Sequence, residues 1–394
     1  MGSLGIINVG CVVTGEFSAP LAAAESIRVE QGRVVALGPL AETGADQCET
    51  VLDAAGTTVA PGLIDSHVHT VFGDWTPRQN MTGWIESYLQ GGITSMMSAS
   101  EVHLPGRPRD RAGVKALAIA AQRSFANHRP AGVKVHAGSV ILEPCLEPAD
   151  FSELRSQGVW LAKMGFGAFA ANQDAVPLVR AARAEGFVVM CHTGGVSIPG
   201  SNTLTAEDLI ALEVDIAGHV NGGTTALPDA GLEQLIRHAH PGMRFQISQA
   251  GNLRSALRVL ALAAAAGRLQ HVLISSDTPT GTGVIPLGVL KSVAELSSLG
   301  GIPPAVAWAM ATGNNAAVLR QNTGRIAVGR EADLVIIDAP AGSAFGTAMD
   351  AVAGGDLPGI SAVVIDGELK VLRSRNTPLA SRLCRVIRGG GPRP

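Results

Sequence analysis

Short apolar segments alternate with alanine-rich segments through the middle of this 394-residue chain, from about residue 59 to residue 320. Eight apolar segments have the length and composition of buried strands: VAPGLIDSHVH, GGITSMMSAS, AGVKVHAGSV, GVWLAKMGFG, GFVVMCHT, VDIAGHV, RFQISQ and HVLISSDT. Helix-like runs such as AGVKALAIAAQRSFANH and RSALRVLALAAAAG lie between them. Eight strands that alternate with helices predict an α/β fold, a (β/α)8 TIM barrel, with a doubly wound open sheet as the alternative.

The two ends of the chain differ from the middle. Residues 1–58 and 321–385 are rich in β-branched runs broken by Gly, Asp and Asn, as in SIRVEQGRVVALG and GREADLVIIDAP, which is typical of strands and hairpins. We therefore expect one small sheet domain built from both termini, with the barrel over residues 59–320. Residues 386–394, which include GGGPRP, are expected to form a disordered tail.

Composition argues against several classes of partner. The chain has 30 basic and 33 acidic residues, so its net charge of −3 gives no electrostatic basis for binding nucleic acid or an anionic membrane. Five scattered cysteines without a CxxC pair are typical of a reduced protein. The longest apolar run, VLALAAAAG, is about half a membrane span, and no charged signal-peptide region precedes Arg28. We expect a soluble, cytoplasmic protein.

The first candidate strand ends in DSHVH, where His67 and His69 are two residues apart. Residues i and i+2 of a strand point to the same face, so both imidazoles can reach one metal ion. The alternative is a pair of surface histidines at a strand end. Asp65 lies on the same face and is a candidate for orienting the pair.

Three further strand ends carry side chains that can bind metals. His192 ends the fifth strand, His219 the sixth and Asp277 the eighth. Active sites of (β/α)8 barrels lie where the strands end, so these side chains are expected to face one mouth together with the first pair. Four imidazoles and a carboxylate that converge in this way predict a metal site.

Lys163 interrupts the apolar fourth strand, GVWLAKMGFG, at the same level. A buried ammonium group is unfavourable by several kcal/mol unless it is paired or neutralised. Reaction with CO2 would convert this lysine into an anionic carbamate, whose two oxygens could bridge two metal ions. A plain ion pair is the alternative.

The same residues resemble the amidohydrolase superfamily. The resemblance rests on PGLIDSHVH, a lysine on strand four, histidines on strands five and six, an aspartate on strand eight and GREADLVIID, and it extends over essentially the whole chain. It implies a TIM barrel with a composite β-sandwich and a centre of two divalent ions, zinc above all, with iron, manganese or cobalt as alternatives. One ion would be held by His67, His69 and Asp277, the other by His192 and His219, with carbamylated Lys163 and a hydroxide between them.

A narrower resemblance is to the enamidase group, which opens the cyclic enamide of tetrahydro-6-oxonicotinate. It is carried by RPAGVKVHAGSVIL, HTGGVSIPGS, GTGVIPLG and DLPGISAVVIDGE. It implies hydrolysis of a C–N bond in a small cyclic amide that could bear a carboxylate, with Asp277 as general acid and base for the metal-bridging hydroxide. Barrels of this type often associate, so a homo-oligomer is expected.

Loops after the strands are expected to determine specificity. HLPGRPRDR carries Arg107, Arg109 and Arg111, which could clamp a substrate carboxylate in a bidentate manner, although any one of them could equally belong to a solvated loop. Further candidates for substrate binding are His136, Ser197 and Thr282.

Other functions are compatible with parts of this pattern. Deaminases of the superfamily generally have a glutamate shortly after the strand-five histidine, and HTGGVSIPG has no carboxylate, so hydrolysis is favoured. A phosphotriesterase- or lactonase-like hydrolase would use the same ligands. A non-catalytic scaffold is disfavoured, because such relatives typically lose metal ligands and here every ligand position is filled.

Overall fold

The computed structural model describes residues 2–70, 83–102, 106–197, 201–222, 225–279 and 283–391. In the middle of the chain, parallel strands alternate with helices, as the sequence predicts. The parallel strands are β8 (Leu63–Val68), β9 (Ile93–Ser98), β10 (Lys134–His136), β11 (Val140–Ile141), β12 (Leu161–Met164), β13 (Val188–Cys191), β14 (Ile216–Ala217), β15 (Arg244–Ser248) and β16 (Val272–Ser275).

These strands form two sheets whose neighbours follow one another in the chain. One sheet has the order β10-β9-β8 and the other runs from β11 to β16. The first and last strands also meet: a parallel bridge joins Val68 to Thr278, and the amide of Asp277 donates to the carbonyl of His67 at 2.9 Å. This is the strand order expected of a (β/α)8 barrel in which β10 and β11 share the third position.

The third strand is broken, whereas AGVKVHAGSV predicts a continuous one. Gly138 has φ of +96° between β10 and β11, a conformation that a glycine adopts without steric strain. The buried carboxylate of Glu101 accepts hydrogen bonds from the amides of Gly138 and Ser139, the latter at 2.8 Å. The two amides at the break therefore keep an acceptor although they leave the ladder.

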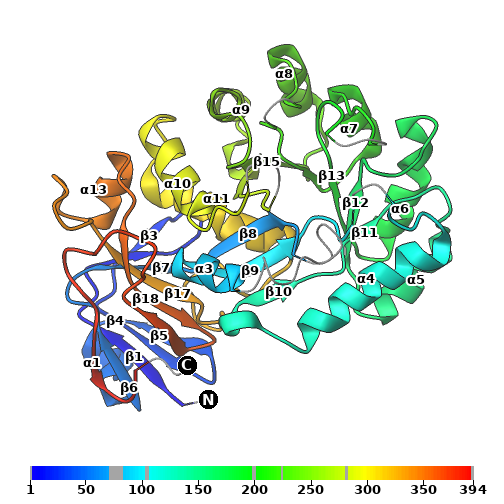
Figure 1. The fold of residues 1–394 in the computed structure, drawn as a ribbon. Coiled ribbons are helices and arrows are strands. Elements are labelled where there is room, and N and C mark those ends of the chain that lie inside the picture. The colour runs from blue at the N-terminus through cyan, green and yellow to red at the C-terminus, as the bar shows by residue number, and fades with distance from the viewer. Residues whose placement is uncertain are drawn as a thin grey trace.

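Helices cover the parallel strands on the outside (Figure 1). Side chains cap two of the longer ones, because Asp110 accepts from the amide of Gly113 at 2.9 Å and Asn252 from that of Ser255 at 3.0 Å. The helices are α3 (Trp84–Gln90), α4 (Arg111–Ala126), α5 (Pro148–Ser156), α6 (Val176–Ala184), α7 (Ala206–Leu212), α8 (Asp229–His238), α9 (Leu253–Ala265), α10 (Gly288–Ser298), α11 (Pro304–Ala311) and α12 (Gly313–Val318). Single 3-10 turns are η3 (Pro130–Gly132), η4 (Asn172–Ala175) and η5 (Leu269–His271).

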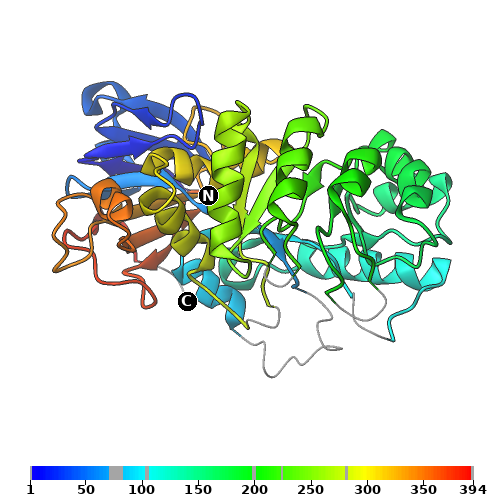
Figure 2. The same ribbon diagram turned by 90° about the horizontal axis from the view of Figure 1, so that it is seen from above.

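The two ends of the chain build two further sheets, with strand orders β20-β6-β1-β4-β5 and β19-β18-β17-β7-β2-β3. Figures 1 and 2 show the blue N-terminal strands beside the orange and red C-terminal segments at one end of the molecule. One apolar cluster takes residues from both sheets, among them Ile6, Val29, Val59 and Leu334, so both ends of the chain supply one core. The elements are β1 (Leu4–Ile7), β2 (Cys11–Val13), β3 (Leu21–Ala22), β4 (Ser26–Glu30), β5 (Arg33–Gly38), α1 (Leu40–Thr43), η1 (Ala45–Gln47), β6 (Thr50–Asp53), β7 (Thr58–Pro61), β17 (Leu334–Asp338), α13 (Ala348–Ala353), β18 (Gly359–Ile365), β19 (Glu368–Leu372) and β20 (Arg385–Arg388).

Two expected boundaries are corrected. β7 pairs with β2 and β17, so the N-terminal part of this unit runs to residue 61 and not to 58. Residues 386–388 were expected to belong to the tail, but they lie in β20, which pairs with β6. The guanidinium of Arg388 also donates to the carbonyl of Asp46 at 2.7 Å, which anchors the end of this strand.

A buried lysine ties the parallel strands to the terminal sheets. Lys134 of β10 places its Nζ 2.8 Å from Asp333 Oδ2, 2.8 Å from Glu331 and 2.7 Å from Asp366. Asp333, the first aspartate of EADLVIID, also accepts from the hydroxyl of Thr323 at 2.9 Å. The motif therefore has a structural role at the junction of the two parts.

All five cysteines are free thiols, with Cys48, Cys191 and Cys384 buried. Packing and hydrogen bonds, without disulfides, therefore stabilise the fold. In the parts of the chain described here, no helix combines the length and the apolar character needed to cross a membrane.

Candidate metal centre

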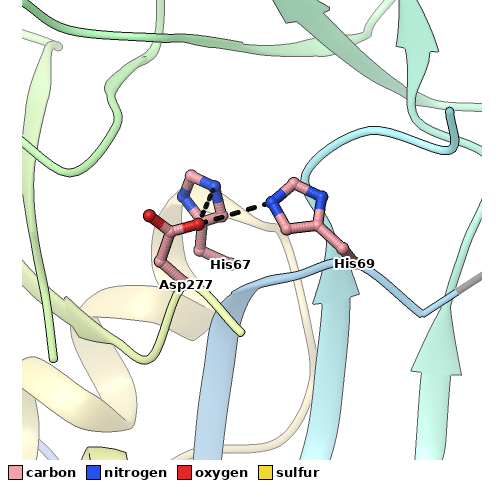
Figure 3. Close-up of side chains that lie close together, drawn as sticks. All are labelled: His67, His69 and Asp277. Atoms are coloured by element: carbon pink, nitrogen blue, oxygen red, sulfur yellow. Dashed lines mark hydrogen bonds and ion pairs between the residues drawn. The ribbon is translucent and has the colours of Figure 1, made fainter. Parts of the chain in front are cut away.

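Two histidines from the end of β8 meet an aspartate that follows β16 (Figure 3). Nε2 of His67 lies 3.2 Å from Oδ1 of Asp277, and Nε2 of His69 lies 3.3 Å from the same oxygen. The three candidate ligand atoms all lie within 4.8 Å of one another. The structure thus brings together the three side chains that the sequence assigns to the first metal ion.

The charge states of this group favour a cation. Burial lowers the pKa of His67 well below its ordinary value, so its imidazole is neutral at neutral pH. Burial works to raise the pKa of Asp277, but the facing imidazoles outweigh it and hold that pKa well below its usual range. A neutral imidazole nitrogen and a carboxylate oxygen only 3.2 Å apart need a proton or a metal ion between their lone pairs.

The second pair of histidines lies beside the first. Nδ1 of His192 is 3.0 Å from Nε2 of His219, and the ring centres of His67 and His219 are 5.4 Å apart. Nε2 of His192 donates to the carbonyl of Gly195 at 2.8 Å, which leaves the Nδ1 lone pair facing His219. Burial lowers the pKa of His192 to about 4 and that of His219 to about 3, so both are neutral, metal-binding forms at neutral pH.

Lys163 lies at the same centre and is fully buried. Its Nζ is 3.4 Å from Nε2 of His67 and 3.6 Å from the sulfur of Met190. Among the described residues it forms no ion pair with a carboxylate, so the ion-pair alternative has no partner there. Burial lowers the pKa of Lys163 to about 8, which raises the fraction of neutral amine, the form that reacts with CO2.

Asp65 does not orient an imidazole, in contrast to the expectation. Its Oδ1 accepts from the amides of His67 at 3.3 Å and Ser276 at 2.9 Å, so it joins the ends of β8 and β16 through the backbone. At Nδ1, the His67 ring contacts Gln246 of β15, whose Oε1 lies 2.6 Å away. Sequence reasoning missed it, although a glutamine between the apolar residues Phe245 and Ile247 was a signal.

Two of the three loop arginines are paired with carboxylates of the same chain. Arg107 is buried, lies 2.5 Å from the carboxylate of Glu143 and donates to the carbonyl of Phe166 at 2.5 Å. This corrects the prediction that it is available as a substrate clamp. Arg111 is held by Asp150 at 2.9 Å at the start of α4.

The remaining candidates for substrate binding are dispersed. Arg109 and Ser197 are exposed. His136 is half-buried at the end of β10, and its ring makes an edge contact with Trp160 at 5.8 Å between centres. Burial lowers the pKa of His136 to about 4. Thr282 lies outside the described residues.

Comparisons with known proteins point to one family. Residues 58–370 match the model of a protein family described as "Amidohydrolase family". Enamidase from Eubacterium barkeri is 47% identical over 385 residues, which is 97% of this chain and 99% of that protein. A crystal structure of enamidase covers 98% of this chain and 100% of its own, at 46% identity and a TM-score of 0.92.

More distant proteins also match this chain. Imidazolonepropionase from Streptomyces griseus subsp. griseus is 27% identical over 361 residues, which is 80% of this chain and 86% of that protein. The crystal structure of a putative prolidase from Bifidobacterium longum is 18% identical and has a TM-score of 0.63 over 95% of both chains, which shows a common fold.

Proposed function

The chain belongs to the amidohydrolase family, and from this premise we propose that it is a metal-dependent hydrolase that opens the C–N bond of a cyclic amide, in the manner of enamidase. The observation that carries the proposal is the convergence of His67, His69 and Asp277, with the neutral imidazole of His67 facing the carboxylate. The 47% identity to enamidase over 97% of the chain supports a cyclic enamide as the substrate class.

The residues present fit two divalent cations. His67, His69 and Asp277 would hold one ion, and His192 and His219 the other. Imidazole and carboxylate donors suit zinc, and also iron, manganese or cobalt. Buried neutral imidazoles bind a cation without first releasing a proton, which supports the assignment.

We propose that Lys163, as a CO2-derived carbamate, would help to hold the two ions and would give them an anionic ligand. Its amine is fully buried, lies 3.4 Å from His67 and has no carboxylate partner among the described residues. A carbamate would add a second anionic group to the centre, beside the Asp277 carboxylate.

Asp277 is assigned the proton transfers. Bound divalent ions would lower the pKa of a water molecule and polarise the amide carbonyl. The Asp277 carboxylate, ionised by its surroundings, accepts the proton of the attacking water and delivers it to the leaving nitrogen. The backbone amide of Asp277 donates a hydrogen bond to the carbonyl of His67 at 2.9 Å, which holds Asp277 in this position.

A carboxylate on the substrate would meet Arg109. Of the three arginines in HLPGRPRDR it is the exposed one, whereas Arg107 is buried in its pair with Glu143. Ser197, Thr282 and His136 stay predictions for substrate contact.

The proposal extends to the whole molecule. We propose that the parallel strands close into a (β/α)8 barrel over residues 62–320 and that the terminal sheets form a composite β-sandwich. A cytoplasmic location and a homo-oligomeric state also stay predictions. Light scattering after size-exclusion chromatography would test the oligomeric state.

A substrate panel tests the proposed chemistry. The purified protein, loaded with zinc, is assayed on tetrahydro-6-oxonicotinate, on an unsubstituted cyclic imide, on a lactone and on a phosphotriester. We expect the highest kcat/KM with the cyclic enamide, whose hydrolysis is monitored by the loss of its ultraviolet absorption. A higher kcat/KM with the lactone or the phosphotriester would instead support the alternative hydrolase.

A further inference from the structure

We propose that Gln246 is a positioning residue that holds the His67 imidazole in the tautomer protonated at Nδ1, so that the Nε2 lone pair is available to a metal ion. The inference rests on the proposed metal-dependent function. Gln246 lies on β15 and His67 at the end of β8, yet their side chains meet at 2.6 Å between Oε1 and Nδ1. Both side chains are almost completely buried, so water does not compete for this contact.

The orientation of the Gln246 amide follows from its other partner. Its Nε2 lies 2.8 Å from the hydroxyl of Ser66 and 3.3 Å from the carbonyl oxygen of Ser66. A backbone carbonyl can only accept, so the NH2 group must face Ser66. The amide oxygen therefore faces His67, and since this oxygen also only accepts, Nδ1 of His67 must carry the proton.

Asp277 would favour the other tautomer in the absence of a cation. Its carboxylate oxygen lies 3.2 Å from Nε2 of His67, close enough to accept a hydrogen bond from a protonated Nε2. Such a bond would join two prospective ligands to each other and compete with a metal ion. Gln246 opposes this arrangement, because a proton on Nε2 would leave two lone pairs facing each other at 2.6 Å.

Gln246 therefore prepares the ligand pair before any ion arrives. A glutamine in a buried strand is unfavourable unless its polar atoms are paired, and here both ends of the amide are paired. Partners that fix the ring orientation of a metal-binding histidine typically change metal affinity by about 10–100-fold when they are removed.

The tautomer can be observed directly in metal-free protein labelled with 15N-histidine. Two-bond 1H–15N spectra distinguish a protonated Nδ1 from a protonated Nε2, and loss of one signal set in His67→Asn assigns His67. We expect a protonated Nδ1 in the wild type and in Ser66→Ala, which keeps the orienting carbonyl, and a shift towards protonated Nε2 in Gln246→Met. A wild-type His67 protonated at Nε2 would overturn the proposal, and this outcome does not depend on whether Gln246→Met folds.

Metal affinity gives a second, independent readout. We expect Gln246→Met to bind cobalt about 10–100-fold more weakly than the wild type and with an altered visible absorption spectrum. Gln246→Glu keeps an acceptor for Nδ1 and should retain affinity within a few-fold of the wild type. Equal affinity and identical spectra for wild type and Gln246→Met would contradict the proposal. A wild type that binds no cation would instead refute the proposed function, while the tautomer measurement would still decide the role of Gln246.

Discussion

Two side chains of the centre lie on backbone that L-residues usually avoid, since φ is +36° at His219 and +59° at Asp277. Such conformations are unfavourable by about 1–3 kcal/mol each and persist where the surroundings hold them. The amide of Asp277 is fixed by the carbonyl of His67, which ties the strained residue to a second ligand. Strain at two candidate ligand positions is typical of functional sites, where the surroundings hold an unfavourable geometry.

Replacement of Asp277 by Asn separates metal binding from proton transfer. Asn keeps an oxygen near His67 and His69 but cannot accept the proton of the attacking water. We expect metal content close to the wild type and a fall in kcat of at least about 100-fold. Metal analysis and steady-state kinetics on the same preparation check this, and retained turnover would refute the assigned role.

Lys163 offers a test that depends on CO2. We expect Lys163→Met to lose one metal ion per chain, because the anionic ligand proposed for the two ions is gone. Lys163→Glu supplies a carboxylate without CO2, so its metal content should not respond to bicarbonate, whereas that of the wild type should rise with it. Equal metal content of wild type and Lys163→Met, with and without bicarbonate, would argue against the carbamate.

At the scale of elements, the break between β10 and β11 depends on Glu101. Its Oε1 accepts from two buried amides, those of Gly138 and Ser139. Glu101→Ala leaves both amides without this acceptor, and we expect the free energy of unfolding to fall by about 2–4 kcal/mol. Glu101→Gln keeps the accepting oxygen and should stay within about 1 kcal/mol of the wild type in denaturant titrations at neutral pH.

The same residue predicts a pH dependence. Burial raises the pKa of Glu101 from 4.5 to about 7, so between these values the folded protein binds more protons at this site than the unfolded chain does. Its contribution to stability is therefore greatest below about pH 4.5 and is lost as the pH rises towards 7. The difference in stability between wild type and Glu101→Gln should change over this interval, and a constant difference would contradict the assigned pKa.

The elements show what the sequence could reveal. The candidate ligands were predictable because each lies at or just after the end of a strand, and the parallel order places the strand ends that carry His67, His192, His219 and Asp277 at one edge. The broken third strand was not predictable, because a single glycine inside AGVKVHAGSV does not disclose that Glu101, 37 residues earlier, accepts its amide. Gln246 was missed for the same reason, as its partner lies 179 residues away.

At the scale of the whole molecule, Lys134 connects the parallel strands to the terminal sheets. Its ammonium group is nearly buried and faces Asp333, Glu331 and Asp366. The pattern EADLVIID identified this region by resemblance, but the pairing with a lysine some 200 residues away follows only from the tertiary structure.

Removal of this lysine should destabilise the whole chain. Lys134→Met leaves the buried carboxylate of Asp333 without its cation, and we expect the free energy of unfolding to fall by about 3–5 kcal/mol. Arg129→Met is the matched control, since Arg129 is 54% exposed and pairs with the same Asp366, so its loss should change stability by less than about 1 kcal/mol. If both substitutions lowered the free energy of unfolding equally in denaturant titrations, burial of the Lys134 ion pairs would not explain their contribution to stability.

The central claim, hydrolysis of a cyclic enamide by a metal centre built on His67, His69 and Asp277, is tested most directly by metal titration of activity. The protein is stripped with a chelator and assayed on tetrahydro-6-oxonicotinate while zinc, iron, manganese or cobalt is returned stepwise. We predict no turnover in the stripped protein and recovery in proportion to the metal bound. Turnover without metal, or no activity with any of the four ions bound, would contradict the account.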